Sequence, residues 1–167
     1  MSPKLCALMI VINSSPAINL TAALGSLELL ANLYGTVIVP HAVFQELEAG
    51  AAKDQTAQLL HATPGVEIRS QPVVIPAWLT SVLDTGEAAV IHTALQESIA
   101  TVILDDLKVR RTAHIAGLEV NGSLGVLVQA KKVGRLPSLR MAIAGLQARG
   151  IWLVRDVVEQ ALRLAGE

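Results

Sequence analysis

The feature that most constrains the fold of this chain is the alternation of short β-type segments with longer segments of helical periodicity. The β-type segments lie at residues 5–12, 36–39, 66–70, 101–104, 118–121 and 151–154. Between them apolar residues recur every three or four positions, which predicts helices. Strands that alternate with helices form a sheet covered on both faces. We therefore expect a three-layer α/β/α fold with a mostly parallel central sheet.

The predicted helices are bounded by the usual capping residues. Ser15 and Pro16 open the first, which runs over residues 17–30. The others cover residues 43–50, 54–62, 86–98, 108–116, 124–132 and 138–149, with a last helix from Asp156. Residues 71–81 are expected to form a loop anchored by the apolar side chain of Trp78.

The high apolar content of the chain has two explanations. Apolar residues make up 52% of the sequence and the mean hydropathy is +0.52, which suits a membrane protein or a sheet buried on both faces. A spanning helix needs about 20 apolar residues, whereas the run at residues 5–12 ends at Asn13. A signal peptide is disfavoured because an amphipathic helix follows at once. We expect a single cytoplasmic domain over residues 1–167, consistent with Cys6 being the one cysteine.

Charge is distributed unevenly along the chain, although the net charge is −1. Residues 1–100 contain three basic and eight acidic residues, and residues 101–167 contain ten basic and six acidic residues. Exposed faces explain this difference most simply. The alternative is a surface for phosphate groups, formed by Lys108, Arg110 and Arg111 on the helix that follows Asp106.

Polar side chains stand at the predicted carboxyl ends of the strands, where ligands bind in parallel sheets. Asn13, Ser14 and Ser15 follow the first strand, and the acids near the other strand ends are Glu46, Glu87, Asp105 and Asp106. Carboxylates that lie close together repel one another, and a hard cation such as Mg²⁺ or Mn²⁺ relieves that repulsion. We therefore expect the four acids to form a metal-binding site.

Each of these residues also has a structural explanation. Glu87 lies three residues after Asp84, the spacing of a capping box. Asp105 or Asp106 could cap the next helix, and Glu46 could lie on a solvated helix face. Asn13 could form a turn at the strand end. Their joint placement after strands favours the site.

Five segments in order resemble the PIN domain, and more closely a prokaryotic PIN-like branch of toxin-type proteins that bind nucleic acid. They are Ile10-Val11-Ile12-Asn13-Ser14-Ser15-Pro16, Val39-Pro40-His41-Ala42-Val43-Phe44-Gln45-Glu46-Leu47, Thr85-Gly86-Glu87-Ala88, Leu104-Asp105-Asp106-Leu107-Lys108-Val109-Arg110 and Gly122-Ser123-Leu124-Gly125-Val126-Leu127. The resemblance covers the chain from Leu5 to about Leu162.

The resemblance implies an endoribonuclease that depends on Mg²⁺ or Mn²⁺, is inhibited by a small antitoxin protein and forms a homodimer. Glu46 corresponds to the second acid of the family, Glu87 to the third, and Asp105 or Asp106 to the fourth. Ser14 and Ser15 correspond to a hydroxyl pair.

The sequence departs from the family at Asn13, which stands where the first Asp is expected. An Asn can offer a metal its carbonyl oxygen but no charge. A catalytically weak or silent PIN scaffold that binds RNA or a protein partner is therefore the alternative function. A phosphatase of the haloacid-dehalogenase type would need a nucleophilic Asp at this position, so Asn13 argues against it.

Overall fold

The computed structural model describes residues 8–167, which contain a five-stranded sheet of order β3-β2-β1-β4-β5. Its strands are β1 (Met9–Ile12), β2 (Thr36–Val39), β3 (Val66–Ile68), β4 (Thr101–Ile103) and β5 (Glu119–Asn121). Every neighbouring pair is parallel. The expected α/β class is thus confirmed, and the sheet in the described residues is wholly parallel.

The position of each strand in the sheet explains its composition. Val11 of β1 aligns with Ile38 on one side and Val102 on the other, so β1 is the central strand. Its residues Ile10–Ile12 are fully buried, as expected of a strand with helices on both faces. The edge strands β3 and β5 carry the charged residues Glu67 and Glu119, which are exposed.

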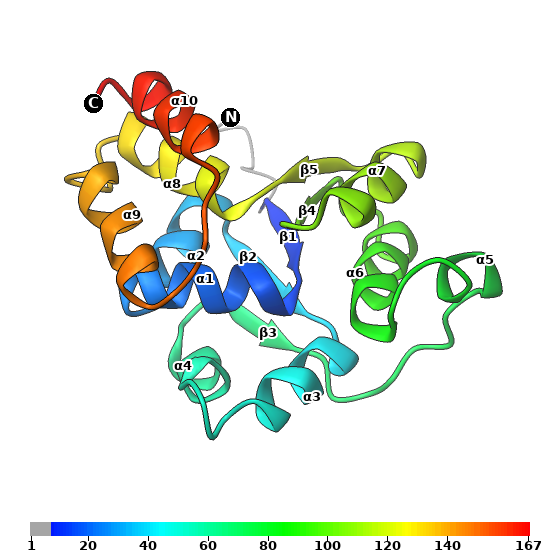
Figure 1. Ribbon diagram of the computed structural model, residues 1–167. Coiled ribbons are helices and arrows are strands. Elements are labelled where there is room, and N and C mark those ends of the chain that lie inside the picture. The colour runs from blue at the N-terminus through cyan, green and yellow to red at the C-terminus, as the bar shows by residue number, and fades with distance from the viewer. Residues whose placement is uncertain (1–7) are drawn as a thin grey trace, which may run out of the picture.

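Helices cover both faces of the sheet. Figure 1 shows α1, α2, α8, α9 and α10 on one side of the sheet and α6 and α7 on the other, which gives the three layers. The helices are α1 (Ser14–Leu24), α2 (Glu28–Tyr34), α3 (His41–Ala49), α4 (Thr56–Ala62), α5 (Ala77–Thr80), α6 (Thr85–Gln96), α7 (Leu107–Ile115), α8 (Ser123–Lys132), α9 (Leu139–Ala148) and α10 (Arg155–Ala165).

The first predicted helix is wrong in its bounds, because it is two helices. Gly25 adopts a left-handed conformation (φ 77°) and donates its N–H to the Thr21 carbonyl at 2.7 Å, which ends α1. The chain then turns so that Leu27 is fully buried. Helix α1 also begins at Ser14, so the N-cap position belongs to Asn13 and not to Ser15.

Two further predictions of local structure are wrong. Residues 151–154 form no strand: Ile151 and Leu153 pack on the core, whereas Trp152 is 82% exposed. Alternating burial there reflects packing against helices, since the sheet in residues 8–167 ends at β5. The predicted loop at 71–81 contains α5, and its anchor is the fully buried Leu79, because Trp78 is 52% exposed.

The first predicted strand is described only from Met9 onward; residues 5–7, with Cys6, lie outside the described residues. No helix within residues 8–167 is long and apolar enough to cross a membrane.

Candidate functional site

Asn13 stands at the carboxyl end of β1, next to the end of β4. Its N–H donates to the Ile103 carbonyl at 3.2 Å, which fixes the start of α1 beside the neighbouring strand. The side chain is 7% exposed and makes no capping hydrogen bond. Its Oδ1 atom is buried without a hydrogen-bond partner. An unpaired buried carbonyl costs about 1–3 kcal/mol, so this amide is a candidate ligand group and not a structural cap.

Ser14 and Glu46 connect the first turn of α1 to α3. The Ser14 hydroxyl donates to Oε2 of Glu46 at 2.9 Å. Burial raises the pKa of Glu46, the charge of Asp84 raises it further, and hydrogen bonds from Ser14 and the Gly86 backbone lower it. Ser15 is exposed, and no hydrogen bond within residues 8–167 uses its side chain. The predicted hydroxyl pair is therefore divided, since only Ser14 reaches an acid.

Gly86, in the first turn of α6, makes the position of Glu46 possible. A Cβ atom added at Gly86 would lie 2.7 Å from Cδ of Glu46, which is closer than any side chain allows. The absence of that atom lets the carboxylate approach the N-terminus of α6, where backbone N–H groups and the helix dipole favour negative charge. The Glu46 carboxylate is thus held at a helix start, although the residue as a whole is exposed on α3.

Glu87 forms the capping box that its spacing allows. Its N–H donates to Oδ1 of Asp84 at 2.9 Å, and the Asp84 N–H donates to Oε2 of Glu87 at 3.2 Å. The pKa of Glu87 is raised by burial and by the charges of Asp84 and Asp106, while the backbone hydrogen bond from Asp84 and the charge of Lys108 lower it. The same carboxylate therefore caps α6 and faces the acid at the start of α7.

Asp105, two residues after the end of β4, accepts three hydrogen bonds. Its Oδ1 accepts from the Ser123 N–H at 2.7 Å, and its Oδ2 accepts from the Ser123 hydroxyl at 2.6 Å and from Nδ2 of Asn19 at 2.9 Å. Gly122, the N-cap residue of α8, offers no side chain, so Asp105 supplies the negative group at that helix start. These bonds join β4, α1 and α8.

Asp106 caps α7. Its Oδ1 accepts from the N–H groups of Lys108 at 2.8 Å and Val109 at 3.1 Å. The two adjacent aspartates therefore accept hydrogen bonds at the starts of different helices. Asp106 does so at the next helix in the chain, and Asp105 at a helix that begins 18 residues further on.

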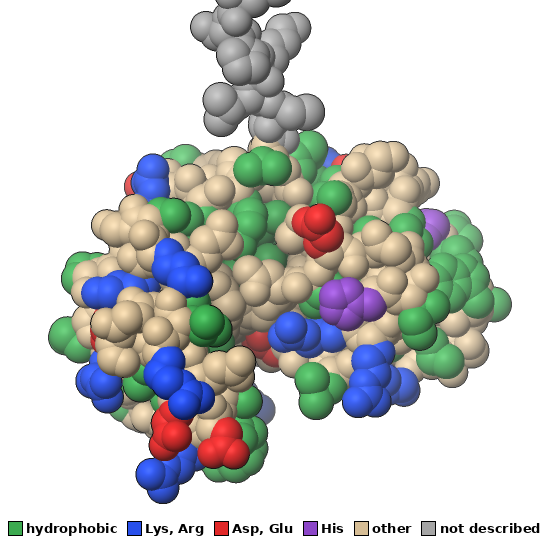
Figure 2. All heavy atoms as spheres, turned by 90° about the horizontal axis from the view of Figure 1, so that it is seen from above, with side chains coloured by type: hydrophobic (Ala, Val, Ile, Leu, Met, Phe, Trp, Pro, Cys, Tyr) green, Lys and Arg blue, Asp and Glu red, His purple; other side chains and the backbone are tan. Residues whose placement is uncertain are grey.

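The basic side chains predicted to contact phosphates differ in position and exposure. A Cβ atom added at Gly122 would lie 2.7 Å from Nη1 of Arg110 and 3.1 Å from Oδ1 of Asp105, so both side chains border Gly122, but no ion pair joins them within residues 8–167. Lys108 and Arg111 are exposed on α7. Figure 2 shows the surface hollowed between the half that carries α8–α10 and the half that carries α7, with Lys and Arg side chains on both sides.

The donor chemistry suits a hard cation, but the residues do not form a closed metal centre. Within the part of the chain that the structure describes, no three His, Cys, Asp or Glu side chains are grouped to hold a metal ion. Glu46, Glu87, Asp105 and Asp106 each accept hydrogen bonds from the protein. Carboxylate oxygens and the unpartnered Oδ1 of Asn13 fit an ion held by one or two side chains and completed by water and phosphate.

Four residues that help to build this edge were missed by sequence reasoning. They are Asn19, Asp84 as a charged neighbour, Gly86 as the space for Glu46, and Ser123. A polar Asn in the apolar first helix was the one usable signal. The effects of Asp84 and Gly86 on Glu46, and of Ser123 on Asp105, are contacts between residues far apart in the chain.

An all-parallel sheet, covered by helices and with acids at its carboxyl edge, places the chain in the class of PIN-like α/β folds. The family model DUF3368, a PIN domain, matches residues 9–167, and the chain belongs to this family. PIN domains have a nuclease-type fold and generally depend on divalent metals. No significant match was found among curated proteins.

Proposed function

We propose that this PIN domain is a Mg²⁺- or Mn²⁺-dependent endoribonuclease of toxin–antitoxin type that hydrolyses RNA phosphodiesters. The observation that carries the proposal is the Glu46 carboxylate, which Ser14 holds at 2.9 Å over the start of α6, close to the charge of Asp84. A carboxylate that is held next to other acids is repelled by them, and a bound cation relieves that repulsion.

Individual residues of the edge have separate tasks in this proposal. Glu46 and Glu87 would hold the ion, and the unpartnered carbonyl of Asn13 is a further candidate ligand. When bound, such an ion polarises the phosphodiester and lowers the pKa of a bound water. Asp105 positions α1 and α8 around the edge through Asn19 and Ser123.

The substrate side of the edge is basic. Lys108 and Arg111 are exposed on α7 and Arg110 borders Gly122, so these three side chains are the ones we expect to contact RNA phosphates. Further expectations carried by the family resemblance are a small antitoxin partner, a homodimer and a cytoplasmic location.

A catalytically silent scaffold that binds RNA or a protein is the second candidate. Two observations favour it: Asn13 brings no charge to the first acid position, and the described residues contain no group of three possible ligands. Asp105 and Asp106 also have complete structural explanations as groups at helix starts.

The test compares purified protein with Glu46→Gln, Asn13→Asp and the double variant Asp105→Asn/Asp106→Asn on mixed-sequence RNA with Mn²⁺. Glu46→Gln keeps an acceptor for Ser14 but removes the charge. Its matched control is Glu48→Gln, on the same exposed part of α3. Melting temperatures identify any variant that is unfolded.

If the protein is a ribonuclease, we expect the native protein to cleave RNA. We then expect Glu46→Gln to reduce cleavage at least about tenfold and Glu48→Gln to leave it unchanged. Cleavage that persists in both Glu46→Gln and the double variant would come from a contaminant and would refute the site. Cleavage that appears only in Asn13→Asp identifies the native protein as the silent scaffold.

A further inference from the structure

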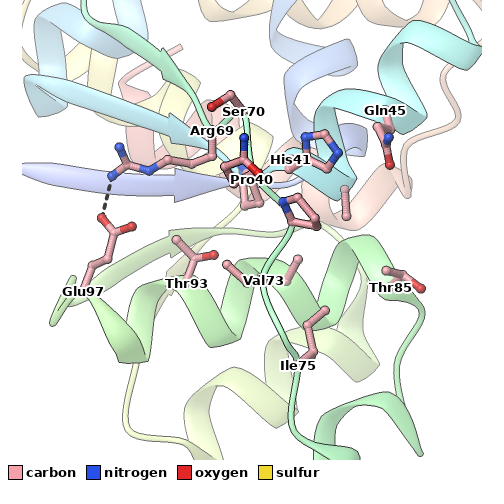
Figure 3. A pocket seen from close by; sticks show the side chains of 14 residues that line it. Pro40, His41, Gln45, Arg69, Ser70, Val73, Ile75, Thr85, Thr93 and Glu97 are labelled. Carbon is pink, nitrogen blue, oxygen red and sulfur yellow. Dashed lines mark hydrogen bonds and ion pairs between the residues drawn. The ribbon is translucent and has the colours of Figure 1, made fainter.

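A cavity of about 370 Å³ lies beside the carboxyl edge of the sheet near Glu46, Glu87, Asp105 and Asp106, which we call the acid edge. The proposed hydrolysis does not use this cavity. Its walls are α3, α6 and residues 69–75, an extended segment after β3 that we call the strap. Figure 3 shows the strap passing between the two helices, with Arg69 at one end of the cavity and Gln45 and Thr85 toward the other. Cavities of about 300–1,000 Å³ hold small organic ligands.

The cavity, which we call the strap pocket, has apolar walls and uncharged polar groups. Val73 and Ile75 of the strap and Ala89 of α6 supply apolar surface. His41, Gln45, Thr85 and Thr93 supply an imidazole, an amide and two hydroxyls.

The polar groups of the strap pocket are not engaged by the protein. Among residues 8–167, no hydrogen bond uses the side chains of His41, Gln45, Thr85 or Thr93. Thr93 is 3% exposed and His41 is half-buried, whereas Gln45 and Thr85 are exposed. In the same pocket Nε of Arg69 is buried without a hydrogen-bond partner. Because buried polar groups are normally paired, a ligand with an acceptor atom is the partner expected there.

The charges of the strap pocket cancel one another. Arg69 donates to Glu97 at 2.6 Å and to Glu67 at 3.2 Å, so its guanidinium is neutralised by protein carboxylates. The pocket therefore lacks a free positive group for a phosphate. It suits a neutral heterocycle that has apolar faces and hydrogen-bonding edges.

The strap pocket and the acid edge share two walls. Gln45 directly precedes Glu46 in α3, and Thr85 directly precedes Gly86, against which the Glu46 carboxylate packs. Aromatic residues are only 2% of the chain, so a base cannot be held on a platform of stacked rings. A slot between apolar walls is the available alternative.

We propose that the strap pocket binds a nucleobase, which the nuclease-type edge next to it receives as part of a single-stranded RNA. The choice of RNA as the source rests on the proposed function; the pocket itself requires only the base. Gln45 and Thr93 face opposite edges of the ring, and Val73, Ile75 and Ala89 cover its faces.

The test is calorimetric and NMR titration, in the presence of EDTA, with each of the four ribonucleoside 5′-monophosphates, with pentanucleotide homopolymers and with ribose 5-phosphate. At least one nucleotide or pentanucleotide is expected to bind and to shift the amide resonances of Ala89 and Thr93. Thr93→Val and Gln45→Ala are each expected to weaken binding roughly 2- to 10-fold, the effect of one hydrogen bond. The matched control Gln58→Ala, an exposed helical glutamine on α4, is expected to leave binding unchanged.

Three results would overturn the nucleobase site: no binding at millimolar concentration, equal binding of ribose 5-phosphate, or equal affinity in Gln45→Ala and Gln58→Ala. Binding of pentanucleotides but not mononucleotides identifies RNA as the source, and equal affinity for both identifies a free nucleotide.

The titrations contain EDTA, which removes any metal, and they do not measure cleavage. Their result therefore does not depend on whether the protein is a ribonuclease. Cleavage without base binding would overturn the pocket alone, and base binding without cleavage would overturn the ribonuclease alone.

Discussion

At the scale of single residues, the acid edge is shaped by groups that lack a charge. Asn13 places an unpartnered carbonyl where an acid is expected, and Gly86 leaves open the space that the Glu46 carboxylate occupies. Asp105 and Asp106, although adjacent, accept hydrogen bonds at the starts of two different helices. A side chain of the right type at a strand end is therefore not automatically free to bind a metal.

Gly86→Ala tests the role of Gly86 in placing Glu46. The added Cβ meets the end of a flexible side chain, so Glu46 turns aside while α6 gains helix propensity of up to about 1 kcal/mol. We expect a melting temperature that is unchanged or slightly higher, together with at least roughly tenfold weaker Mn²⁺ binding in a calorimetric titration. Unchanged Mn²⁺ affinity would show that Glu46 does not bind the ion.

At the scale of elements, a partly buried polar network connects helices to the sheet. Nδ2 of Asn121, in β5, donates to the Tyr34 hydroxyl at 3.0 Å, and that hydroxyl donates to Oε1 of Gln129 in α8 at 2.8 Å. The Gly122 N–H donates to Oδ1 of Asn121 at 3.0 Å. Gly125 lies against this amide: an added Cβ would be 3.0 Å from its Cγ.

Gly125→Ala and Gly145→Ala are a matched pair of helical substitutions with opposite expected signs. Alanine at Gly125 displaces Asn121 and breaks the network, so we expect a loss of roughly 1–3 kcal/mol of stability. A Cβ at Gly145 of α9 meets nothing within 4 Å, so we expect a gain of about 0.5–1 kcal/mol. Denaturant unfolding measures the change in the free energy of unfolding for each variant. Changes of the same sign in the two variants would contradict the role of Asn121.

Glu167 stabilises the start of α9, and its titration makes stability depend on pH. Hydrogen bonds from the N–H groups of Arg140 and Leu139, with Lys131 and Ser138 nearby, lower the pKa of Glu167 from 4.5 to about 2. A lowered carboxyl pKa means that the folded state binds fewer protons than the unfolded state. This contribution is therefore complete above pH 4.5 and is lost as the pH falls toward 2.

Glu167→Gln is expected to lower the melting temperature at pH 7, with a difference from the native protein that shrinks between pH 4.5 and 2. Glu159→Gln is the control, because its carboxylate is exposed on α10 and pairs only with Arg155. A difference for Glu167→Gln that stays constant from pH 7 to pH 2 would contradict the capping role.

At the scale of the whole molecule, one apolar cluster runs from Ile10 in β1 to Leu162 in α10. The same cluster includes buried residues of β2, β4, α3, α6, α8 and α9. Because the layers share their buried side chains, they are expected to unfold together as the single domain predicted from the sequence.

We predict one calorimetric transition with equal calorimetric and van't Hoff enthalpies. At about 0.7 kcal/mol per residue near 60 °C, the 167 residues correspond to roughly 120 kcal/mol. Two separate transitions, or an enthalpy ratio well above one, would show that part of the chain unfolds independently.

The fold class and the approximate positions of most elements can be predicted from the sequence of this protein. Periodicity and apolar strand runs are local properties, so β2, β4, α6 and α7 lie close to their predicted positions. The same logic misread residues 151–154, because alternating apolar residues pack equally well on helices and in a sheet. The acids at the strand ends were also evident from position alone.

Only the tertiary structure decided what those acids do. Ser14 meets Glu46 across 32 residues of sequence and Asn19 meets Asp105 across 86, so no local pattern contains either hydrogen bond. The space left by Gly86 and the unpartnered oxygen of Asn13 likewise exist only once separate elements pack together. Residue type and strand position were therefore readable in the chain, whereas the partners of each side chain depend on distant elements meeting at one edge of the sheet.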